Sequence, residues 1–332
     1  MNRLGKATIT DIAKRVNMTT VTVSRALNQP EKVKKETLEQ ILKVAKELNY
    51  VPNAFARNLK NRESRLVGLV TASLENPFYG EIIKAITRQA KTRGYTLMLF
   101  DTDGSPELEA RAIDTLLSYQ VAGLMLSVIS DDDQYQPSYL AKLEMAAIPV
   151  VQIDRQLSGA PFAGVYLDNE HSGYQGARAL LAQGLRRVLV VAGPQRSSIS
   201  LARLAGIRRA LEQWPEPTVV EVVHGDYTQA PARDAVRNYL QSGKWPEVIF
   251  GLNALMTLGA LQAMRELGLS RNDIALFSID QVRYAELFGE PIPCISHSGT
   301  QLGIGAINLL LGQIDDPSQP VEDKVIEGRL LL

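Results

Sequence analysis

Residues 8–33 read TITDIAKRVNMTTVTVSRALNQPEKV, and this stretch decides the fold of the amino-terminal part of the chain. Thr8 stands three residues before Asp11, the spacing of a capping box in which the two side chains bond backbone amides reciprocally. Apolar residues then recur at helical spacing up to Val16. Asn17 follows, and asparagine tolerates the left-handed conformation better than most residues. The pattern predicts a short helix that ends in a tight turn.

The residues after this turn predict two more helices. Thr19 can cap a helix over 20–27, and Gln29-Pro30 breaks that helix. A third amphipathic segment runs from about Val33 to Leu48, with its apolar residues on one stripe. Two short helices around a tight turn, braced by a third helix, form the helix-turn-helix arrangement.

The charge of the chain is unevenly distributed. Residues 1–65 hold 14 Lys and Arg against 6 Asp and Glu, a net of +8, and since the whole chain is formally neutral the remainder carries −8. A basic head on an acidic body favours contact between the head and a polyanion such as nucleic acid. From charge alone, a solvated basic surface is an equal alternative.

The composition is that of a globular protein with more than one domain. Its 332 residues exceed the ~100–200 typical of one domain, and 45% apolar with 22% charged residues exclude a disordered or collagen-like chain. No run approaches the ~18 apolar residues of a membrane span, and the first residues lack the apolar core of a secretory signal. Cys294, the only cysteine, excludes an intrachain disulfide and a cysteine-rich zinc site. We therefore expect a cytoplasmic protein with no membrane partner.

From residue 66 onward, short apolar runs alternate with helical patterns. The apolar runs cover 66–72, 95–100, 123–129, 149–153, 187–192, 248–252 and 274–279. The helical patterns cover roughly 78–92, 107–119, 170–183, 200–213, 229–241, 254–267 and 301–311. Continuous apolar strands separated by helices predict parallel sheets covered on both faces, and the segment is long enough for two of them. Ligands of such sheets bind beyond the carboxyl ends of the strands.

These features together resemble the lac repressor family of bacterial regulators over nearly the whole chain, from about Thr8 to Gly328. The most specific matches are T-V-S-R at 22–25 and P-N-x-x-A-R-x-L at 52–59. The later matches are N-P-F-Y at 76–79, D-G-S-P-E at 103–107, I-D-R at 153–155, R-L-A-G at 203–206, G-D-Y at 225–227 and a helix start at Asn253. A single match would carry little weight, but this many in the right order form a specific signal.

The resemblance implies a fold and a domain organisation. An all-α helix-turn-helix domain (1–50) and a hinge helix with linker (51–65) would precede a core (66–332) like the periplasmic sugar-binding proteins. That core has two doubly wound parallel-sheet α/β subdomains with an effector in the cleft between them. Crossings near 160, 292 and 320 would give subdomains of about 66–160 plus 293–319 and 161–292 plus 320–332.

The resemblance also assigns DNA contacts within the head. Thr20 and Val21 lie in the first turn of the recognition helix, and Arg25 can bond guanine bidentately. The small donors suited to phosphate contacts are Thr8, Thr19, Thr22, Ser24 and Asn28. Without the resemblance, helix caps or plain surface residues are the alternative for these small side chains.

The segment Asn53 to Lys60 reads as a helix too short to be stable alone. By resemblance, Leu59 of each subunit of a homodimer wedges into the minor groove at the centre of a palindromic operator and kinks it. Asn53, Ala56 and Arg57 would accompany it. An ordinary linker helix, with Leu59 packed on Ala56, is the alternative.

The effector contacts that the resemblance implies lie at strand ends of the core. They are Asn76, Phe78, Tyr79, Arg155, Arg203, Tyr227, Asn253, Asp280 and His297. Tyr227 would cover the face of a sugar-like ligand, Asp280 and Asn253 would bond its hydroxyls, and Arg203 would hold a hydroxyl or an oxyanion. Arg155 and His297 are as readily surface or interdomain residues, and Phe78 and Tyr79 as readily core aromatics.

Departures from the family pattern bear on the effector. Ala122, Ala254 and Gln281 stand where the family usually has Asp, and Ser278 replaces a Gly. A less negative cleft that retains two arginines favours a sugar phosphate or sugar acid over a neutral sugar. The core looks nearest the fructose and sucrose repressor branch, whereas Q-P-E-K-V at 29–33 looks more like gluconate-type regulators.

The expected function is a sequence-specific repressor of a carbohydrate-utilisation operon, controlled by this effector. An activator or dual regulator of the same family, and a sugar-binding protein without a DNA role, are the alternatives. No dinucleotide fingerprint, phosphate loop or nucleophile elbow occurs, and the three histidines lack metal-ligand spacing. We therefore expect no enzyme activity, no cofactor and no metal. No leucine heptad follows Gly312, so we expect a dimer rather than a coiled-coil tetramer.

Overall fold

The structure is a computed structural model that describes residues 7–51, 64–289, 291–318, 320 and 322–332. The chain divides into two compact units, Met1–Ser64 and Arg65–Leu332. The predicted hinge residues Asn53, Ala56, Arg57 and Leu59 lie outside the described residues. No helix in the described part is long and apolar enough to cross a membrane.

The first unit is the predicted three-helix module. Its elements are α1 (Ile9–Val16), α2 (Thr20–Asn28), the 3₁₀ helix η1 (Pro30–Lys32) and α3 (Lys35–Glu47). The capping box at Thr8 is present, and Asn17 ends α1 in the left-handed conformation with φ 55°. Ile12, Val23 and Ile41 are fully buried at the centre of this unit. Helix α3 begins later than predicted because Val33 is extended after η1.

The second unit contains two six-stranded sheets. The first has the order β11-β5-β4-β3-β1-β2 and the second the order β12-β10-β9-β8-β6-β7. The strands are β1 (Leu66–Thr71), β2 (Thr96–Asp101), β3 (Gly123–Leu126), β4 (Val150–Ile153), β5 (Gly164–Leu167), β6 (Arg187–Ala192), β7 (Val219–His224), β8 (Val248–Gly251), β9 (Ala275–Ile279), β10 (Cys294–Ser296), β11 (Lys324–Ile326) and β12 (Arg329–Leu331). All neighbouring strands pair in parallel except β12, which pairs antiparallel with β10.

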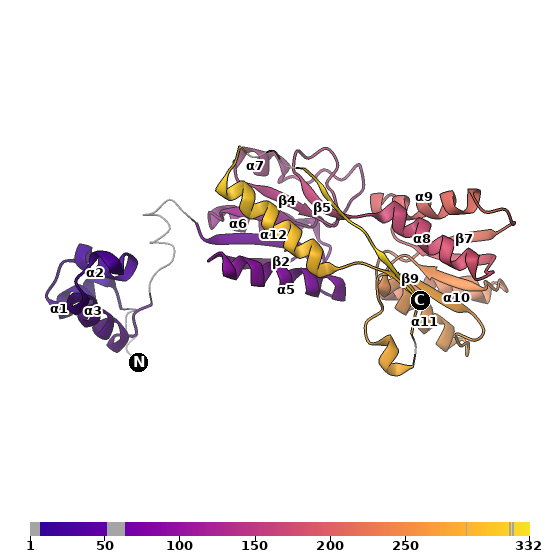
Figure 1. Cartoon of the computed structure of the whole chain (residues 1–332), viewed down its shortest axis with the longest axis horizontal. Coiled ribbons are helices and arrows are strands. Elements are labelled where there is room, and N and C mark those ends of the chain that lie inside the picture. Colours follow the sequence, from indigo (N-terminus) through magenta and orange to yellow (C-terminus); the bar gives the residue numbers. More distant parts are fainter. Residues whose placement is uncertain (1–6, 52–63, 290, 319, 321) are drawn as a thin grey trace. The chain divides into compact units, whose positions relative to one another are not determined.

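Helices cover both sheets. They are α5 (Pro77–Thr92), α6 (Pro106–Ser118), α7 (Leu140–Met145), α8 (Asn169–Ala182), α9 (Ser198–Glu212), α10 (Gln229–Gln241), α11 (Ala254–Glu266), the 3₁₀ helix η2 (Ala285–Phe288) and α12 (Gly299–Asp315). Figure 1 shows α12, drawn in yellow, lying along the first sheet, where its buried residues pack with those of β1, β4 and β5. The expected fold class, a helix-turn-helix domain plus a two-sheet α/β core, is therefore what the chain adopts.

The crossings between the two sheets lie later in the chain than expected. Strand β5 belongs to the first sheet, β10 to the second and β11 to the first, which corrects the subdomain boundaries at 160, 292 and 320. The crossings follow β5, β10 and β11 instead, and the last is the yellow segment that runs between the lobes in Figure 1. Hydrogen bonding decides the membership of these strands, because they have only three or four residues and no long apolar run.

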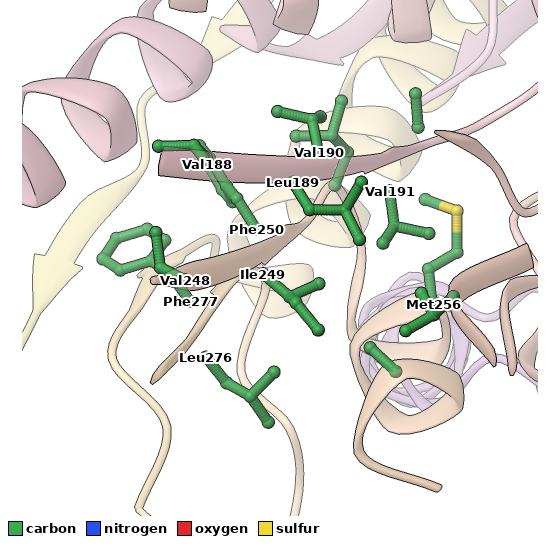
Figure 2. Packing of buried hydrophobic residues seen from close by; sticks show 14 of the residues in the cluster. Val188, Leu189, Val190, Val191, Val248, Ile249, Phe250, Met256, Leu276 and Phe277 are labelled. Atoms are coloured by element: carbon green, nitrogen blue, oxygen red, sulfur yellow. The ribbon is translucent and has the colours of Figure 1, made fainter. Parts of the chain in front are cut away.

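The core of the second lobe is built from the long apolar runs. Figure 2 shows Val188 to Val191 of β6 packed with residues of β8 and β9, including Phe250 and Phe277. These two rings meet edge to face with centroids 5.0 Å apart. Burying continuous apolar strands on both faces is what a parallel sheet requires. This rigid sheet fixes the positions of the loops at its carboxyl end.

Helices α8 and α9 pack closely, and this packing fixes the position of Arg203, a cleft residue on α9. A side chain at Gly173 would clash with the carbonyl of Arg203, and one at Gly206 would clash with the carbonyl of Glu170. Glycine at both positions lets the helix backbones lie close together. Arg203 is thereby held at the inner edge of α9.

Candidate functional site

The carboxyl ends of the two sheets open into one cavity of about 490 Å³, a size suited to a small molecule. Its wall comes from loops after β1, β2, β3 and β4 on one side and after β6, β7, β8 and β9 on the other. Eight of the nine predicted effector residues line it: Asn76, Phe78, Tyr79, Arg155, Arg203, Tyr227, Asn253 and Asp280. His297 does not line the cavity but lies behind Asp280, because its ring is fully buried in the crossing after β10.

The first lobe contributes a buried tyrosine and carboxylate. The hydroxyl of Tyr79 lies 2.8 Å from Ser127 Oγ and donates to Asp154 Oδ2 at 2.8 Å. Burial raises the pKa of Asp154 above its ordinary value, against the lowering effect of Arg155 and the Tyr79 bond. Burial likewise raises the pKa of Tyr79, so its hydroxyl stays protonated. Tyr79 is therefore both a core aromatic and a part of the cavity wall.

The guanidinium of Arg155, from the first lobe, lies over the ring of Tyr227, from the second lobe, and both line the cavity. Arg155 Nη1 donates to the carbonyl of Ile129 at 2.5 Å, and its guanidinium lies 5.3 Å from the centre of the Tyr227 ring. The Tyr227 hydroxyl lies 2.5 Å from Ser197 Oγ, and burial raises the pKa of Tyr227 to about 12. Tyr227 adopts φ 60°, and a side chain at Gly193 would clash with its ring. The ring is thus fixed by its neighbours.

Arg203 is 4% exposed and bonded within its own lobe. Its Nε donates to Asn169 Oδ1 at 2.9 Å, and its Nη1 donates to the carbonyl of Leu252. Neither bond uses Nη2. An arginine held in this way presents its remaining donors in a fixed direction, which suits recognition of an oxyanion.

Asn253 already has partners for both polar atoms of its side chain. Its amide nitrogen donates to the carbonyl of Tyr227 at 2.9 Å, and its oxygen accepts from the backbone amide of Met256 at 2.7 Å. It therefore caps α11 and fastens the Tyr227 loop. A bond from Asn253 to an effector hydroxyl stays a prediction and would have to be shared with these bonds.

Acidic residues outnumber basic residues in the wall of the cavity. Besides Asp280, the wall contains Glu75, Asp103, Asp131, Asp132, Asp154 and Asp226, against the arginines Arg155, Arg196 and Arg203. A cleft less negative than is usual in the family stays a prediction, but the cavity of this chain still contains more acidic than basic side chains. Most of these acids follow a strand directly or within a few residues, and that position is the signal that could have identified them.

Asp131 forms a clasp between the two lobes, which we define as its contacts with Ser197, Ser198 and Ile199. Its Oδ2 accepts from Ser197 Oγ at 2.8 Å, from Ser198 Oγ at 2.9 Å and from the backbone amide of Ile199 at 2.8 Å. A carboxylate at the first turn of a helix is stabilised by the unpaired amides and the dipole there. Arg196 adds ion pairs with Asp132 at 2.8 Å and Asp133 at 3.0 Å. These contacts therefore join the two lobes at the wall of the cavity.

In the head, the predicted recognition helix is α2. Thr20 and Arg25 are exposed, and Val21 is 61% exposed although it is apolar. Thr19 caps α2 through the amide of Thr22, and Thr8 caps α1. Asn28 donates to the carbonyl of Ser24 at 2.8 Å. The small donors are therefore partly used within the helices, while the first turn of α2 offers free side chains.

Comparison with known proteins matches the two units separately. A model described as "Bacterial regulatory proteins, lacI family" matches residues 8–53, and one described as "Periplasmic binding proteins and sugar binding domain of LacI family" matches residues 64–328. The HTH-type transcriptional repressor PurR of Escherichia coli O1:K1 / APEC is 32% identical over 98% of this chain and 95% of its own length. PurR of Klebsiella pneumoniae (strain 342) is similar to the same degree.

Solved structures are similar over the same extent. The lac repressor dimer bound to operator and the anti-inducer ONPF has a TM-score of 0.84 and 26% identity, covering 98% of each chain. The complex of the transcriptional regulator CelR with cellobiose has a TM-score of 0.71 and 26% identity, covering 98% of this chain and 99% of that chain. The regulator Cra from Pseudomonas putida with fructose 1-phosphate has a TM-score of 0.73 at 20% identity, covering 81% of this chain and 98% of that one, and shows likeness of fold alone.

Proposed function

The chain belongs to the LacI family of bacterial regulatory proteins, and from this premise we propose that a small carbohydrate-derived effector in the cleft controls its hold on operator DNA. It is a DNA-binding transcriptional repressor with a sugar-binding type of core. Its relatives are regulators, and we infer that this chain likewise regulates and does not catalyse a reaction.

We propose that the chain binds a palindromic operator as a homodimer. One recognition helix contacts only a few base pairs, so useful affinity requires two heads on two half-sites. The solved lac repressor similar to this chain is a dimer on its operator, which supports the proposal. Thr20, Val21 and Arg25 would then face base edges, and the capping hydroxyls of Thr8 and Thr19 would lie near phosphates.

The effector that the cleft fits best is a sugar acid with a single negative charge. The observation that carries this proposal is the pair of arginines, Arg155 and Arg203, which line one cavity and are each tied to a backbone carbonyl. Carboxylates elsewhere in the wall suit sugar hydroxyls, which can donate to them. They also repel a second negative charge, so a carboxylate fits better than a dianionic phosphate.

A thermal-shift screen tests this proposal. Purified full-length protein is heated with D-gluconate, D-fructose 1-phosphate, D-ribose or cellobiose, and we expect the sugar acid to raise the melting temperature most, since a ligand that binds only the folded state stabilises it. The variant Arg203→Ala should lose this response. Arg208→Ala, on the exposed face of the same helix α9, is the matched control and should retain it.

The result that contradicts the proposal is equally specific. If only the neutral sugars stabilise the wild-type protein, or if Arg203→Ala responds like Arg208→Ala, the arginine pair does not recognise an anion. Retention of a promoter fragment on a column of the protein, with and without the stabilising compound, then reports whether the same compound changes DNA binding.

A further inference from the structure

His297 lies where the chain crosses between the two lobes. It follows β10 in the second crossing, and its ring is fully buried. Its Nδ1 lies 2.7 Å from Asp280 Oδ1, in the cavity wall, and its Nε2 lies 2.9 Å from Ser172 Oγ, near the start of α8 after the first crossing. A Cβ at Gly328, in the third crossing, would lie 2.8 Å from Nε2. One imidazole in the second crossing therefore bonds α8 just after the first crossing, bonds Asp280 in the cavity wall and lies next to Gly328 in the third crossing.

The hydrogen bonds of Ser172 fix the proton on Nε2. A hydroxyl has one proton to donate, and Ser172 Oγ donates it to the carbonyl of Asp168 at 2.6 Å, since a carbonyl can only accept. The bond between Ser172 and His297 must then run from Nε2–H to the serine oxygen. Nε2 is therefore protonated.

The state of Asp280 fixes the proton on Nδ1. Nδ1 of His297 and Oδ1 of Asp280 lie 2.7 Å apart, and two acceptors cannot bond each other, so one proton lies between them. A carboxylic acid ordinarily gives up its proton at lower pH than an imidazolium does, so the proton resides on the ring and Asp280 is ionised. An ionised carboxylate can only accept a hydrogen bond. The bond from His297 to Asp280 Oδ1 must then be donated by Nδ1–H.

We propose that His297 is an imidazolium, protonated on both ring nitrogens, that positions Asp280 in the cleft and ties it to the start of α8. His297 is a positioning residue, because it acts on the effector through Asp280. The proposal rests on the proposed function only in that Asp280 contacts the effector; the protonation state itself follows from Ser172, Asp168 and Asp280 alone.

The other ionisable groups around the pair are compatible with this assignment. Arg203 and Asp154 act on Asp280 from the cavity with opposite signs. Cys294 lies behind Asp280 in β10, and burial, with the nearby carboxylates, raises the pKa of its thiol to about 11, so it carries no charge. The carboxylate of Asp168 is turned to the backbone amide of His171 at 3.0 Å. Asp280 is thus the carboxylate that the imidazolium bonds directly.

Both ring protons of His297 are needed to keep its two hydrogen bonds. Loss of one proton at high pH removes a donor from His297, and either Asp280 or Ser172 then loses its bond. Asp280 would then be held less firmly for its contact with the effector.

Nuclear magnetic resonance of the full-length protein tests the proposal directly. The chain has three histidines, His171, His224 and His297, so selective labelling of histidine with ¹⁵N gives three ring systems. The variant His297→Asn assigns the signals of His297 by their loss. We expect both ring nitrogens of His297 to show attached protons near neutral pH, whereas a neutral ring shows one.

Two variants make the outcome specific. Asp280→Asn removes the negative charge, and His297 should then lose one proton at the same pH; Asn308→Asp, on the exposed face of α12, is a charge change remote from the ring and should leave its signals unaltered. A wild-type His297 with a single protonated nitrogen would overturn the proposal. Addition of D-gluconate to the same sample is a separate arm: absence of any shift at a doubly protonated His297 speaks against the proposed effector and not against the imidazolium.

Discussion

Glu109 is a carboxylate that has no exposure to water in the first lobe. It accepts from the amide of Ile129 at 2.7 Å and from the hydroxyls of Tyr135 at 2.6 Å and Tyr139 at 2.7 Å. Ile129 is the residue whose carbonyl holds Arg155. Glu109 therefore fastens the loop that carries one of the cleft arginines, although it lies outside the cavity itself.

Stability should depend on the protonation of Glu109. Burial raises the pKa of Glu109 above 4.5, so the folded state favours the neutral acid. The stability that the neutral side chain contributes to the folded state is present at low pH and is lost as the pH rises through the raised pKa. Compared with Glu109→Gln, which stays neutral, the wild-type protein should lose free energy of unfolding as the pH rises above 4.5, the ordinary pKa of the side chain. Urea unfolding at a series of pH values measures this difference.

The control for this effect lies in the same helix. Glu107 is exposed, and hydrogen bonds to its own backbone amide and to Ser105 lower its pKa, so Glu107→Gln should change stability little and with the opposite dependence on pH. Equal pH profiles for Glu109→Gln and wild type would show that the tyrosine and amide donors compensate burial completely.

Arg25 is the residue on which operator selectivity should depend most. It is exposed on α2 and can bond a guanine with two parallel hydrogen bonds. Arg25→Ala should reduce discrimination between operator and random duplex by about 1–3 kcal/mol, with the core equally stable. Lys43→Ala, an exposed cation on α3, is the control and should weaken both duplexes alike. Competition binding at fixed salt measures the ratio, and an unchanged ratio for Arg25→Ala would exclude base readout by this side chain.

At the scale of residues, the sequence predicted which side chains line the cavity but not which hydrogen bonds they form. The motif matches led to eight cavity residues, because residues at the carboxyl ends of strands meet at one edge of a sheet. They could not reveal that Asn253 bonds the Tyr227 loop, that His297 stands behind Asp280, or that Asp131 reaches the other lobe. Those contacts join positions 26, 17 and 68 residues apart and depend on the packed tertiary structure.

At the scale of elements, the amino-terminal end of α9 is where the lobes are clasped. The long helix offers unpaired amides there, and Asp131 from the other lobe accepts one of them together with two hydroxyls. Replacement of the carboxylate by an amide retains the shape but removes the charge and one acceptor.

Asp131→Asn should therefore weaken the contact between the two lobes by about 1.5–3 kcal/mol, the range of a hydrogen bond to a charged group. Small-angle scattering of the protein without effector should show a larger radius of gyration for this variant. Glu144→Gln changes an exposed acid on α7 of the same lobe, away from these contacts, and should scatter like wild type. A compact Asp131→Asn protein would mean that the crossings alone keep the lobes together.

The elements differ in how far the sequence could predict them. Long apolar runs such as Val188 to Val191 predicted their strands correctly, because a strand buried on both faces has no polar position. Strands β5, β10 and β11 escaped prediction, since three or four residues give no periodicity and their sheet is decided by pairing with distant partners. The tail of the chain holds two of these short strands, β11 and β12, one in each sheet.

At the scale of the whole molecule, the unit proposed to bind DNA is basic and the unit that contains the cavity is acidic. The basic residues are concentrated in the unit Met1–Ser64, and the acid residues prevail in the unit Arg65–Leu332, which contains the cavity. A polyanion is attracted by the first unit and repelled by the second. This division is visible in the sequence, but charge alone left a solvated basic surface as an equal alternative, and the motif matches at 22–25 and 52–59 decided between the two.

The two sheets repeat one strand order, and equivalent loops carry equivalent residues. Asp154 follows β4 with φ 64°, and Asp280 follows β9, the strand at the same place in the other sheet, with φ 67°. Asp103 and Asp226 correspond in the same way after β2 and β7, with φ 47° and 51°. Each lobe thus supplies half of a binding site on its own scaffold. A chimaera that exchanges a single lobe with a relative would keep one half of the recognition and replace the other, so that new metabolites could be sensed without redesigning the pocket as a whole.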